Sequence, residues 1–494
     1  MGLSLLVANG VLGSVLVWLG SGYLDCRKIA VISTLIGFVI FYMLTAQIDF
    51  SSSSLQLVES YRWIPALNVQ FIMAIDGVSW VLIALTLFIH LIIVLSSFLV
   101  DYDDMPLYMA LFLFMQSMIM GVFVAFDAVL FYMFWEGMLI PMYLCIGVFG
   151  SKDRSFAAMK FFLYTFLGSV FMLVGMIYLG SQAGSFAFED MVRLPLSLFE
   201  QQWLFLALLF AFAVKIPMFP LHTWLPDAHT EAPASGSVIL AALMLKVGAY
   251  GLIRISMPIL PDASAFFAPL MVVLSLIAII YVGIVAFSQT DIKRLIAYSS
   301  VAHMGFVTLG LFLIYSSTNN NLSCFGYTGA LVQMISHAFG SGALFLTFGL
   351  LYSRCKTRQV SDLQGVASQM PYYSMFFMLF VFSTIGVPLT AGFVGEWMVL
   401  ITALSLTPVV GLLATLTLVL SASYLLTMYK SVFFGVPSSK VSGLSDITGT
   451  EIVILSLISL VILAIGVYPQ AIISPMSQSV NSLVELSQMT KLVS

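Results

Sequence analysis

The dominant pattern along this chain is a series of long apolar segments separated by short polar connections. A helix that spans a membrane needs about 20 mostly apolar residues, and the 494-residue sequence contains 14 such segments. They lie near residues 3–20, 29–46, 77–100, 106–124, 127–148, 157–180, 203–227, 233–257, 264–288, 292–316, 325–352, 371–404, 406–434 and 450–472. These runs are continuous, unlike the ten-residue alternation of a β-barrel. The pattern predicts an all-α membrane protein with about 14 transmembrane helices.

Two of these segments are interrupted. The seventh contains KIPMFP, with Pro217 and Pro220 near its middle, and the twelfth contains TIGVPLTAGFVGEW, with Pro388 among several glycines. Proline removes a helical hydrogen bond and clashes with the preceding turn. Paired interruptions in separate halves of a transporter indicate an ion or substrate site. Two kinks that serve only packing are the alternative.

Composition agrees with a membrane domain and excludes several other classes. The chain is 61% hydrophobic and 8% charged, whereas soluble proteins have roughly 25% charged residues. The net charge is −4, and no basic patch indicates binding to nucleic acid. The four cysteines form no CxxC or Cys/His pair. They therefore support neither a zinc site nor an iron–sulfur cluster.

The basic residues are distributed unevenly among the connections. Of the lysines and arginines outside the two deeply placed lysines, 12 follow odd-numbered segments. The other four are Arg62, Arg193, Arg254 and Lys491, which follow even-numbered segments or lie in the tail. The positive-inside rule places the first set in the cytoplasm or matrix, so both termini face the opposite side. Residues 474–494 are more polar, as in an interfacial amphipathic helix or a frayed tail.

Four ionisable residues lie inside predicted spans. They are Glu136 in FYMFWEGMLIPMY, Lys215 beside the first break, Lys246 in ALMLKVGAY and Glu396 after the second break. A charge inside a membrane is costly and is by default a functional hypothesis. Structural ion pairing is the alternative, but buried pairs stabilise a fold poorly. Two acids and two bases on four helices therefore predict a relay.

Three histidines also lie near the middle of predicted spans. Histidine titrates near physiological pH and can pass protons. His337 in MISHAFGSG and His303 in YSSVAHMGF have polar neighbours, which favours a role in proton transfer. His90 in LFIHLII has none. Satisfied core histidines and a bis-histidine haem site are the alternatives, but no histidine pair recurs with cofactor spacing.

A further cluster of polar residues follows the first break, in PLHTWLPDAHTEAP. His222, Asp227, His229 and Glu231 superficially resemble a metal site. The prolines of this run argue against a single helical face, so we expect polar contacts that hold the half-helix. No phosphate loop or dinucleotide fingerprint is present. The chain is therefore not expected to hold a redox cofactor itself.

The stretch KIPMFPLHTWLPDAHTEAPASGSVILAALMLKVGAYGLIRI resembles the antiporter-like membrane subunits of respiratory complex I, NADH–ubiquinone oxidoreductase, and in particular chain 4. FWEGMLIPMYLCIGVFG, QTDIKRLIAYSSVAHMGFVTLG and the GVPLTAGFVGEW region agree with this resemblance. It covers roughly residues 70–470.

The resemblance implies a fold with two inverted five-helix repeats, each containing one broken helix. The implied division is 1–105 for the first three helices, 106–257 for the first repeat (helices 4–8), 258–436 for the second repeat (helices 9–13), and 437–494 for the last helix and tail. In sequence, the two repeats show only weak similarity to each other.

The resemblance also implies a function. Family members translocate protons through buried Glu, Lys and His residues and water, coupled to quinone reduction elsewhere in the complex. By motif, this relay is Glu136, Lys215, Lys246 and Glu396, and His303 and His337 match polar positions on the path. The complex is implied to use NADH, FMN, iron–sulfur clusters and ubiquinone, with none of them in this chain.

Partners and location follow from the same resemblance. The implied partners are other membrane subunits of complex I, especially neighbouring antiporter-like subunits, together with lipids and protons, but not nucleic acid. The implied location is the mitochondrial inner membrane, with the bacterial plasma membrane as the alternative. Other interpretations are a subunit of a cation/proton antiporter or membrane-bound hydrogenase, a chloroplast relative that reduces plastoquinone, and a passive scaffold. The four buried charges argue against the scaffold.

Overall fold

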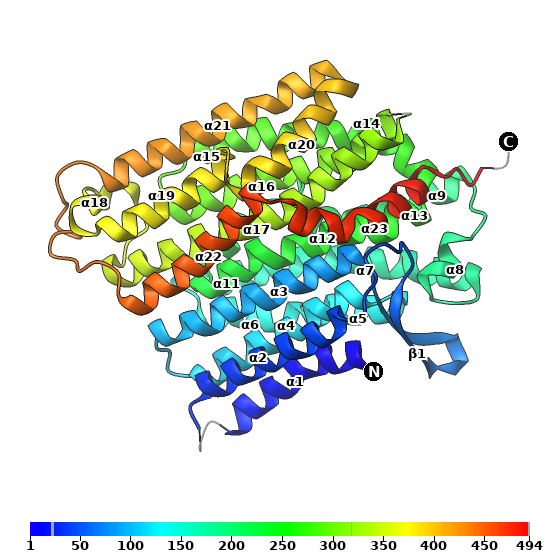
Figure 1. Ribbon diagram of the computed structural model, residues 1–494, viewed down its shortest axis with the longest axis horizontal. Helices are drawn as coiled ribbons and strands as arrows, with labels where there is room; N and C mark the ends of the chain where they lie inside the picture. The colour runs from blue at the N-terminus through cyan, green and yellow to red at the C-terminus, as the bar shows by residue number, and fades with distance from the viewer. Residues whose placement is uncertain (21–23, 318, 493–494) are drawn as a thin grey trace. The chain divides into compact units, whose positions relative to one another are not determined.

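The computed structural model describes residues 1–20, 24–317 and 319–492, and most of these are helical (Figure 1). Among them, 13 helices are long and apolar enough to cross a membrane. Two shorter apolar helices, Pro371–Ile385 and Ala391–Leu406, together occupy the predicted twelfth span. The prediction of an all-α membrane protein is confirmed, because helices form all 14 predicted segments apart from short breaks in the seventh and the twelfth.

The elements up to Phe287 are α1 (Gly2–Gly20), α2 (Cys26–Thr45), β1 (Gln56–Ile64), η1 (Pro65–Leu67), β2 (Val69–Ile75), α3 (Gly77–Ser96), η2 (Ser97–Leu99), α4 (Met105–Val124), α5 (Ala128–Gly137), α6 (Leu139–Phe149), α7 (Arg154–Ala183), α8 (Phe188–Val192), α9 (Leu198–Lys215), α10 (Trp224–Glu231), α11 (Ala234–Ile239), η3 (Leu240–Met244), α12 (Leu245–Gly251), η4 (Leu252–Ser256), α13 (Met257–Ile259), α14 (Pro261–Ile277), η5 (Ala278–Val282) and α15 (Gly283–Phe287). The later ones are α16 (Ile292–Phe312), η6 (Leu313–Ser316), α17 (Asn320–Cys355), η7 (Val360–Asp362), α18 (Val366–Gln369), α19 (Pro371–Ile385), α20 (Ala391–Leu406), α21 (Pro408–Phe433), α22 (Gly449–Val467) and α23 (Gln470–Gln488).

The chain forms two compact units. The first comprises Met1–Ile216, Lys246–Ala268 and Ser474–Ser494, of which Val493 and Ser494 lie outside the described residues. The second comprises Pro217–Leu245 and Pro269–Ile473. The four-part division at 105, 257 and 436 that the resemblance implies stays a prediction.

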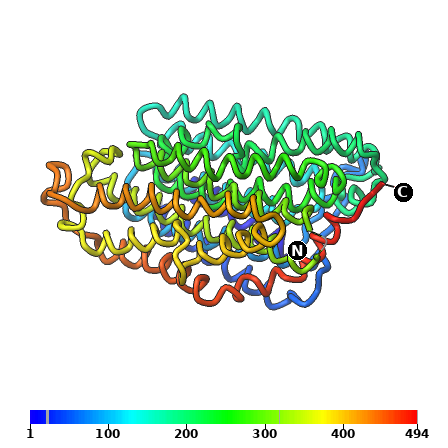
Figure 2. The backbone as a smooth tube through the Cα atoms, turned by 90° about the horizontal axis from the view of Figure 1, so that it is seen from above, coloured from blue at the N-terminus to red at the C-terminus, as the bar shows by residue number. Residues whose placement is uncertain are grey.

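Small and polar residues hold the helices of the first unit close together. Asn9 Nδ2 donates to Ser33 O at 2.9 Å, and Ser117 Oγ donates to Val7 O at 2.6 Å. These bonds join α1 to α2 and α4. Inside a membrane the hydrophobic effect does not drive helices together, so close packing of small residues and hydrogen bonds between helices stabilise their association instead. In the same unit α7 and α9 run side by side, as Figure 2 shows.

A β-hairpin between the second and third helices was not predicted. Strands β1 and β2 pair antiparallel, with Tyr61 opposite Phe71. The turn ends at Asn68 in the left-handed conformation (φ 50°). The buried carboxylate of Glu59 on β1 accepts a hydrogen bond from Leu3 N at 2.7 Å, which fixes the hairpin to α1.

Both predicted helix breaks are confirmed. Helix α9 ends at Lys215, and α10 begins only at Trp224. Helix α19 ends at Ile385, and α20 begins at Ala391. Pro217 and Pro388 therefore both lie in non-helical backbone, as expected for residues that cannot donate a helical hydrogen bond.

The tail is helical as far as Gln488. Met476, Val480, Leu483 and Val484 form its buried face. Ser479 Oγ on the same face accepts a hydrogen bond from Gly77 N at 3.0 Å. Of the two interpretations of residues 474–494, the structure thus favours an amphipathic helix, within the described residues up to 492.

Candidate functional site

Lys215 is a buried cation at the C-terminus of α9. Its side chain is 1% exposed, and its Nζ hydrogen-bonds to no described residue. The Nζ lies 5.3 Å from the ring centroid of Trp135 and 5.9 Å from that of Phe161. Aromatic faces attract a cation, and a helix C-terminus favours positive charge. These features stabilise the ammonium form without a direct anionic contact.

Glu136 is the ninth residue of α5 and is half-buried. Its carboxyl group hydrogen-bonds to Ser169 and Tyr132 and interacts electrostatically with Lys215. Its Oε1 has no hydrogen-bond partner among the described residues. Glu136 and Lys215 therefore form a pair whose charges attract each other without a hydrogen bond between them.

Lys246 lies on α12 and is completely buried. The π-helical turns η3 and η4 precede and follow α12, and such turns occur frequently at functional sites. A Cβ on Gly248 would lie 2.9 Å from Lys215 Cβ and from Ile216 N. Glycine at this position thus lets α12 pack directly against the end of α9, where the first break begins.

Glu396 is the centre of a second polar cluster, in the second unit. It lies on the second turn of α20, just after the second break, and is 2% exposed. Its Oε1 accepts a hydrogen bond from Gln333 Nε2 at 2.9 Å and lies 2.9 Å from His303 Nδ1. With an ionised carboxylate, His303 Nδ1 must bear the hydrogen. The cluster therefore contains an acid and an imidazole in direct contact.

His337 extends this cluster along α17. The ring centroids of His303 and His337 are 5.9 Å apart, and His337 Nε2 lies 3.0 Å from Ser341 Oγ. A cavity of about 10 Å³ is lined by His303, His337 and Glu396, which is roughly the space for one water molecule. His303 Nε2, Gln333 Oε1 and Glu396 Oε2 are buried without hydrogen-bond partners among the described residues. A water here would have several polar atoms to bind.

The glycines of the second break permit this geometry. Gly386 ends α19 in the left-handed conformation (φ 83°), and a Cβ on it would lie 2.8 Å from Glu396 Oε2. A Cβ on Gly395 would lie 2.5 Å from Gln333 N. Any larger residue at either position would push the carboxylate or α17 away.

The structure brings together most of the predicted site residues within their own units. Glu136 and Lys215 interact in the first unit, and the helix of Lys246 packs against the end of α9. Glu396, His303 and His337 form one cluster in the second unit. His90 is buried in the first unit, and its Nδ1 lies 2.9 Å from Thr86 O of its own helix.

Sequence reasoning missed several polar neighbours of these residues. Gln333 was not singled out, although it lies one helical turn before His337 and directly contacts Glu396. Ser169 and Tyr132 beside Glu136 were also missed, as was the aromatic cover of Lys215. The adjacency of Trp135 to Glu136 was the available signal for that cover.

The polar contacts expected after the first break are found. Asp227 Oδ1 pairs with Arg294 at 2.8 Å, and Glu231 Oε1 pairs with Arg358 at 3.4 Å. The ring of His229 stacks on Phe345 with centroids 4.4 Å apart. No group of His, Cys, Asp and Glu among the described residues is arranged to hold a metal ion. The residues after the break thus attach the half-helix to its neighbours.

Arg254 was expected in one of the polar connections between spans, and this expectation was wrong. It lies in η4, inside the span Ala234–Ile259, and is 8% exposed. Its guanidinium pairs with Asp76 Oδ2 at 2.6 Å. A partner of opposite charge, 178 positions away in the sequence, allows this arginine to be buried. Arg254 therefore does not count toward the charge bias of the loops, and the orientation itself stays a prediction.

Comparison with known proteins agrees with this architecture. Residues 125–421 match the family described as "NADH:quinone oxidoreductase/Mrp antiporter, TM". NADH-quinone oxidoreductase subunit M of Rickettsia typhi is 41% identical over 92% of this chain and 91% of its own length. NADH-ubiquinone oxidoreductase chain 4 of Marchantia polymorpha is 38% identical over 93% of this chain and 92% of its own length. The chain therefore belongs to the membrane-spanning family of NADH:quinone oxidoreductases and Mrp antiporters.

Solved structures have the same fold. A chain of respiratory complex I from Thermus thermophilus is 28% identical, has a TM-score of 0.87, and matches over 98% of this chain and 100% of its own. A chain of an archaeal membrane-bound sulfane sulfur reductase is similar in fold, with a TM-score of 0.87 at 22% identity over 98% of both chains. This protein is thus a multi-pass membrane protein with the antiporter-like fold.

Proposed function

We propose that this chain is the membrane subunit of the chain 4 or subunit M type in an NADH–quinone oxidoreductase, and that it translocates protons. The observation on which the proposal rests is the buried cluster of Glu396, His303 and Gln333 at a helix break. A buried acid in contact with an imidazole and beside a water-sized cavity is suited to proton transfer. It has little value for stability alone.

In the first unit, Glu136 controls how firmly Lys215 holds its proton. Its negative charge stabilises the nearby ammonium, and the pair has no hydrogen bond that would lock it closed. A rearrangement that moves the carboxylate away leaves Lys215 charged among aromatic rings. Transfer of the proton from Lys215 to Lys246 then becomes favourable. The helix that contains Lys246 packs against the same break.

In the second unit, the proton is passed among His337, His303 and Glu396. His303 can accept a proton at Nε2 and release the one at Nδ1 to Glu396, which is in hydrogen-bond contact. The free energy that such transport requires is modest. Moving one proton against about 150 mV costs roughly 3.5 kcal/mol, which corresponds to a change of two to three pKa units in a proton-carrying group.

The redox chemistry of the proposed complex belongs to other subunits. NADH, FMN, iron–sulfur clusters and ubiquinone would be bound there, and this chain would contribute no cofactor ligand. Its partners would be the other membrane subunits, in particular neighbouring antiporter-like chains. Both the mitochondrial inner membrane and the bacterial plasma membrane fit the relatives.

Two measurements test the proposal in sequence. The first is purification of this chain from its native membrane. Flavin and iron–sulfur subunits that catalyse NADH oxidation should accompany it, and their absence would favour a separate cation/proton antiporter.

The second is a measurement of NADH-driven proton uptake by membranes containing Glu136→Gln. The amide keeps the size of the side chain but removes the charge that stabilises protonated Lys215. Pumping should fall while native-gel abundance is kept, and unchanged pumping would reject the role of Glu136.

A further inference from the structure

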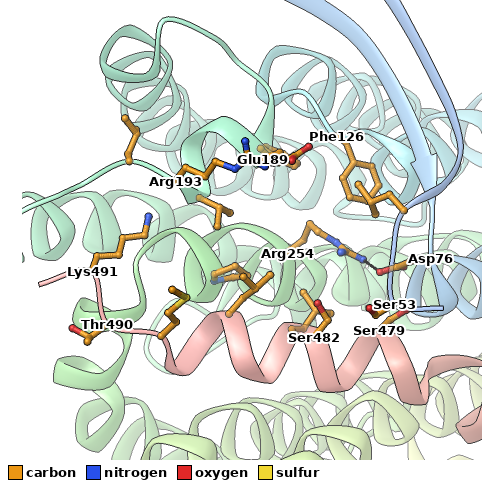
Figure 3. Close-up of a pocket in the computed structure, with 18 of the residues that line it drawn as sticks. Ser53, Asp76, Phe126, Glu189, Arg193, Arg254, Ser479, Ser482, Thr490 and Lys491 are labelled. Atoms are coloured by element: carbon orange, nitrogen blue, oxygen red, sulfur yellow. Dashed lines mark hydrogen bonds and ion pairs between the residues drawn. The ribbon is translucent and has the colours of Figure 1, made fainter. Parts of the chain in front are cut away.

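A large cavity lies in the first unit, away from the relay residues. Its volume is about 650 Å³, within the range of pockets that hold drug-sized ligands. Three segments enclose it: α8 together with the residues that follow α8, the end of the helix that contains Arg254, and the amphipathic tail helix α23 (Figure 3). None of the proposed relay residues lines it.

This cavity lies at the level where membrane spans end. Asp76 immediately precedes the span that begins at Gly77, and Phe126 lies between the spans ending at Val124 and beginning at Ala128. Pro195 precedes the span from Leu198, and Pro258 is in the last turn of the span that ends at Ile259. Span ends coincide with the boundary between hydrocarbon and headgroups. A ligand here would therefore meet both environments.

The lining combines apolar walls with an excess of positive charge. Phe126, Phe188, Leu194, Leu483 and Leu486 contribute to the apolar walls. The charged lining residues are three cations, Arg193, Arg254 and Lys491, and two acids, Asp76 and Glu189. Three positive charges minus two negative charges leave a net charge of +1.

The acids neutralise two of these cations only in part. Arg254 pairs with Asp76, yet its Nε–H is buried without a partner among the described residues. Arg193 pairs with Glu189 at 2.5 Å but remains exposed, so its other N–H groups can bind a ligand. Lys491 Nζ donates to the carbonyl of Met191 at 3.4 Å and interacts electrostatically with Asp262, which lies outside the lining. In Figure 3 the three cations lie around the cavity and extend from different segments.

We propose that this cavity binds one anionic phospholipid. The phosphodiester carries one negative charge, which matches the net charge of the lining, and it is an acceptor for the N–H groups of Arg193 and Lys491. The acyl part lies along the apolar walls. A zwitterionic lipid would bring a cationic headgroup beside these cations and is therefore disfavoured. The bound lipid would connect the tail helix to the region around α8.

The test is photocrosslinking in the assembled complex, reconstituted into nanodiscs. Phosphatidylglycerol with a diazirine near its headgroup should label peptides from 188–195 and 474–492, and phosphatidylcholine with the same group should label them several-fold less. The double variant Arg193→Gln/Lys491→Gln should lose about 25-fold of the phosphatidylglycerol labelling, at about fivefold for each interfacial cation. The charge-matched control Arg62→Gln/Lys152→Gln, outside the cavity, should keep it.

A second variant separates loss of the site from misfolding. Ser482→Trp fills the cavity without changing charge and should abolish labelling in complexes of normal native-gel abundance. Equal labelling by the two lipids, unchanged labelling in the double variant or in Ser482→Trp, or no labelling of these peptides would each overturn the proposal. Suppression of labelling by millimolar glycerol phosphate would also overturn it, because the headgroup alone would then be the ligand.

Discussion

Glu396→Gln should abolish proton transfer in the second unit while leaving the structure largely intact. The carboxylate accepts at Oε1 from Gln333 Nε2 and contacts His303 Nδ1, both at 2.9 Å. Glutamine presents an oxygen in the same place and can keep both contacts. Its amide nitrogen replaces Oε2, which has no hydrogen-bond partner among the described residues. What is lost is the charge and the capacity to take up a proton.

The expected cost in stability is small. Two charge-assisted hydrogen bonds become neutral ones, at roughly 1 kcal/mol each, so the free energy of unfolding should fall by about 2 kcal/mol. Glu396→Ala would instead leave His303 Nδ1 and Gln333 Nε2 unpaired and open a cavity, at about 4 kcal/mol or more. For transport, loss of a positioned acid–base group should slow the transfer step by about a hundredfold or more.

The assay compares abundance with pumping in the same membranes. Native gels report assembly, and quenching of a pH-sensitive dye in sealed vesicles reports NADH-driven proton uptake. Glu485→Gln, an exposed glutamate on α23, is the matched control and should behave like the unmodified chain. Normal proton uptake per NADH in Glu396→Gln at normal abundance would refute the relay role. Low abundance with proportionate pumping would mean that Glu396 serves only structure.

Three further predictions concern topology, packing and charge. A cysteine introduced as Lys152→Cys should react with impermeant thiol reagents from the matrix or cytoplasmic side only, because of the charge bias of the loops; labelling from the other side would contradict the orientation. Gly248→Ala should lower the thermal stability of the complex, at roughly 1–3 kcal/mol for overpacking against Lys215. Gly175→Ala, where a Cβ meets nothing closer than 3.6 Å, should be neutral or stabilising, and equal effects of the two would refute the close-packing argument. Burial lowers the pKa of Lys491 from 10.5 to about 8. The rate of its acylation by a competing reagent should therefore rise with pH, with an inflection near 8. An inflection near 10.4, the pKa of a free lysine, would contradict the burial of its amine.

The amino-acid sequence alone was enough to predict the apolar spans and the two breaks. Inside lipid each backbone polar group must be satisfied within the segment, so a spanning helix has to be a long apolar run, and its ends are visible in the sequence. The prolines at 217 and 388 remove helical hydrogen bonds regardless of their surroundings, so the breaks are local properties as well. The cost of burying a charge likewise identifies Glu136, Lys215, Lys246 and Glu396 from composition alone. The hairpin at 56–75 was missed because its two short strands depend on pairing with each other, not on hydropathy.

Which polar groups contact each other depends on how the helices pack. Gln333 and His303 are 63 and 93 positions from Glu396, and Asp76 is 178 positions from Arg254. The apolar pattern shows that these residues face the interior, but several helices offer interior positions at the same depth, so the choice of partner depends on how the helices pack. The cavity beside α23 has the same origin, because its cations come from segments that are distant in the chain. Such contacts result from the packing of the whole unit, and no local pattern records them.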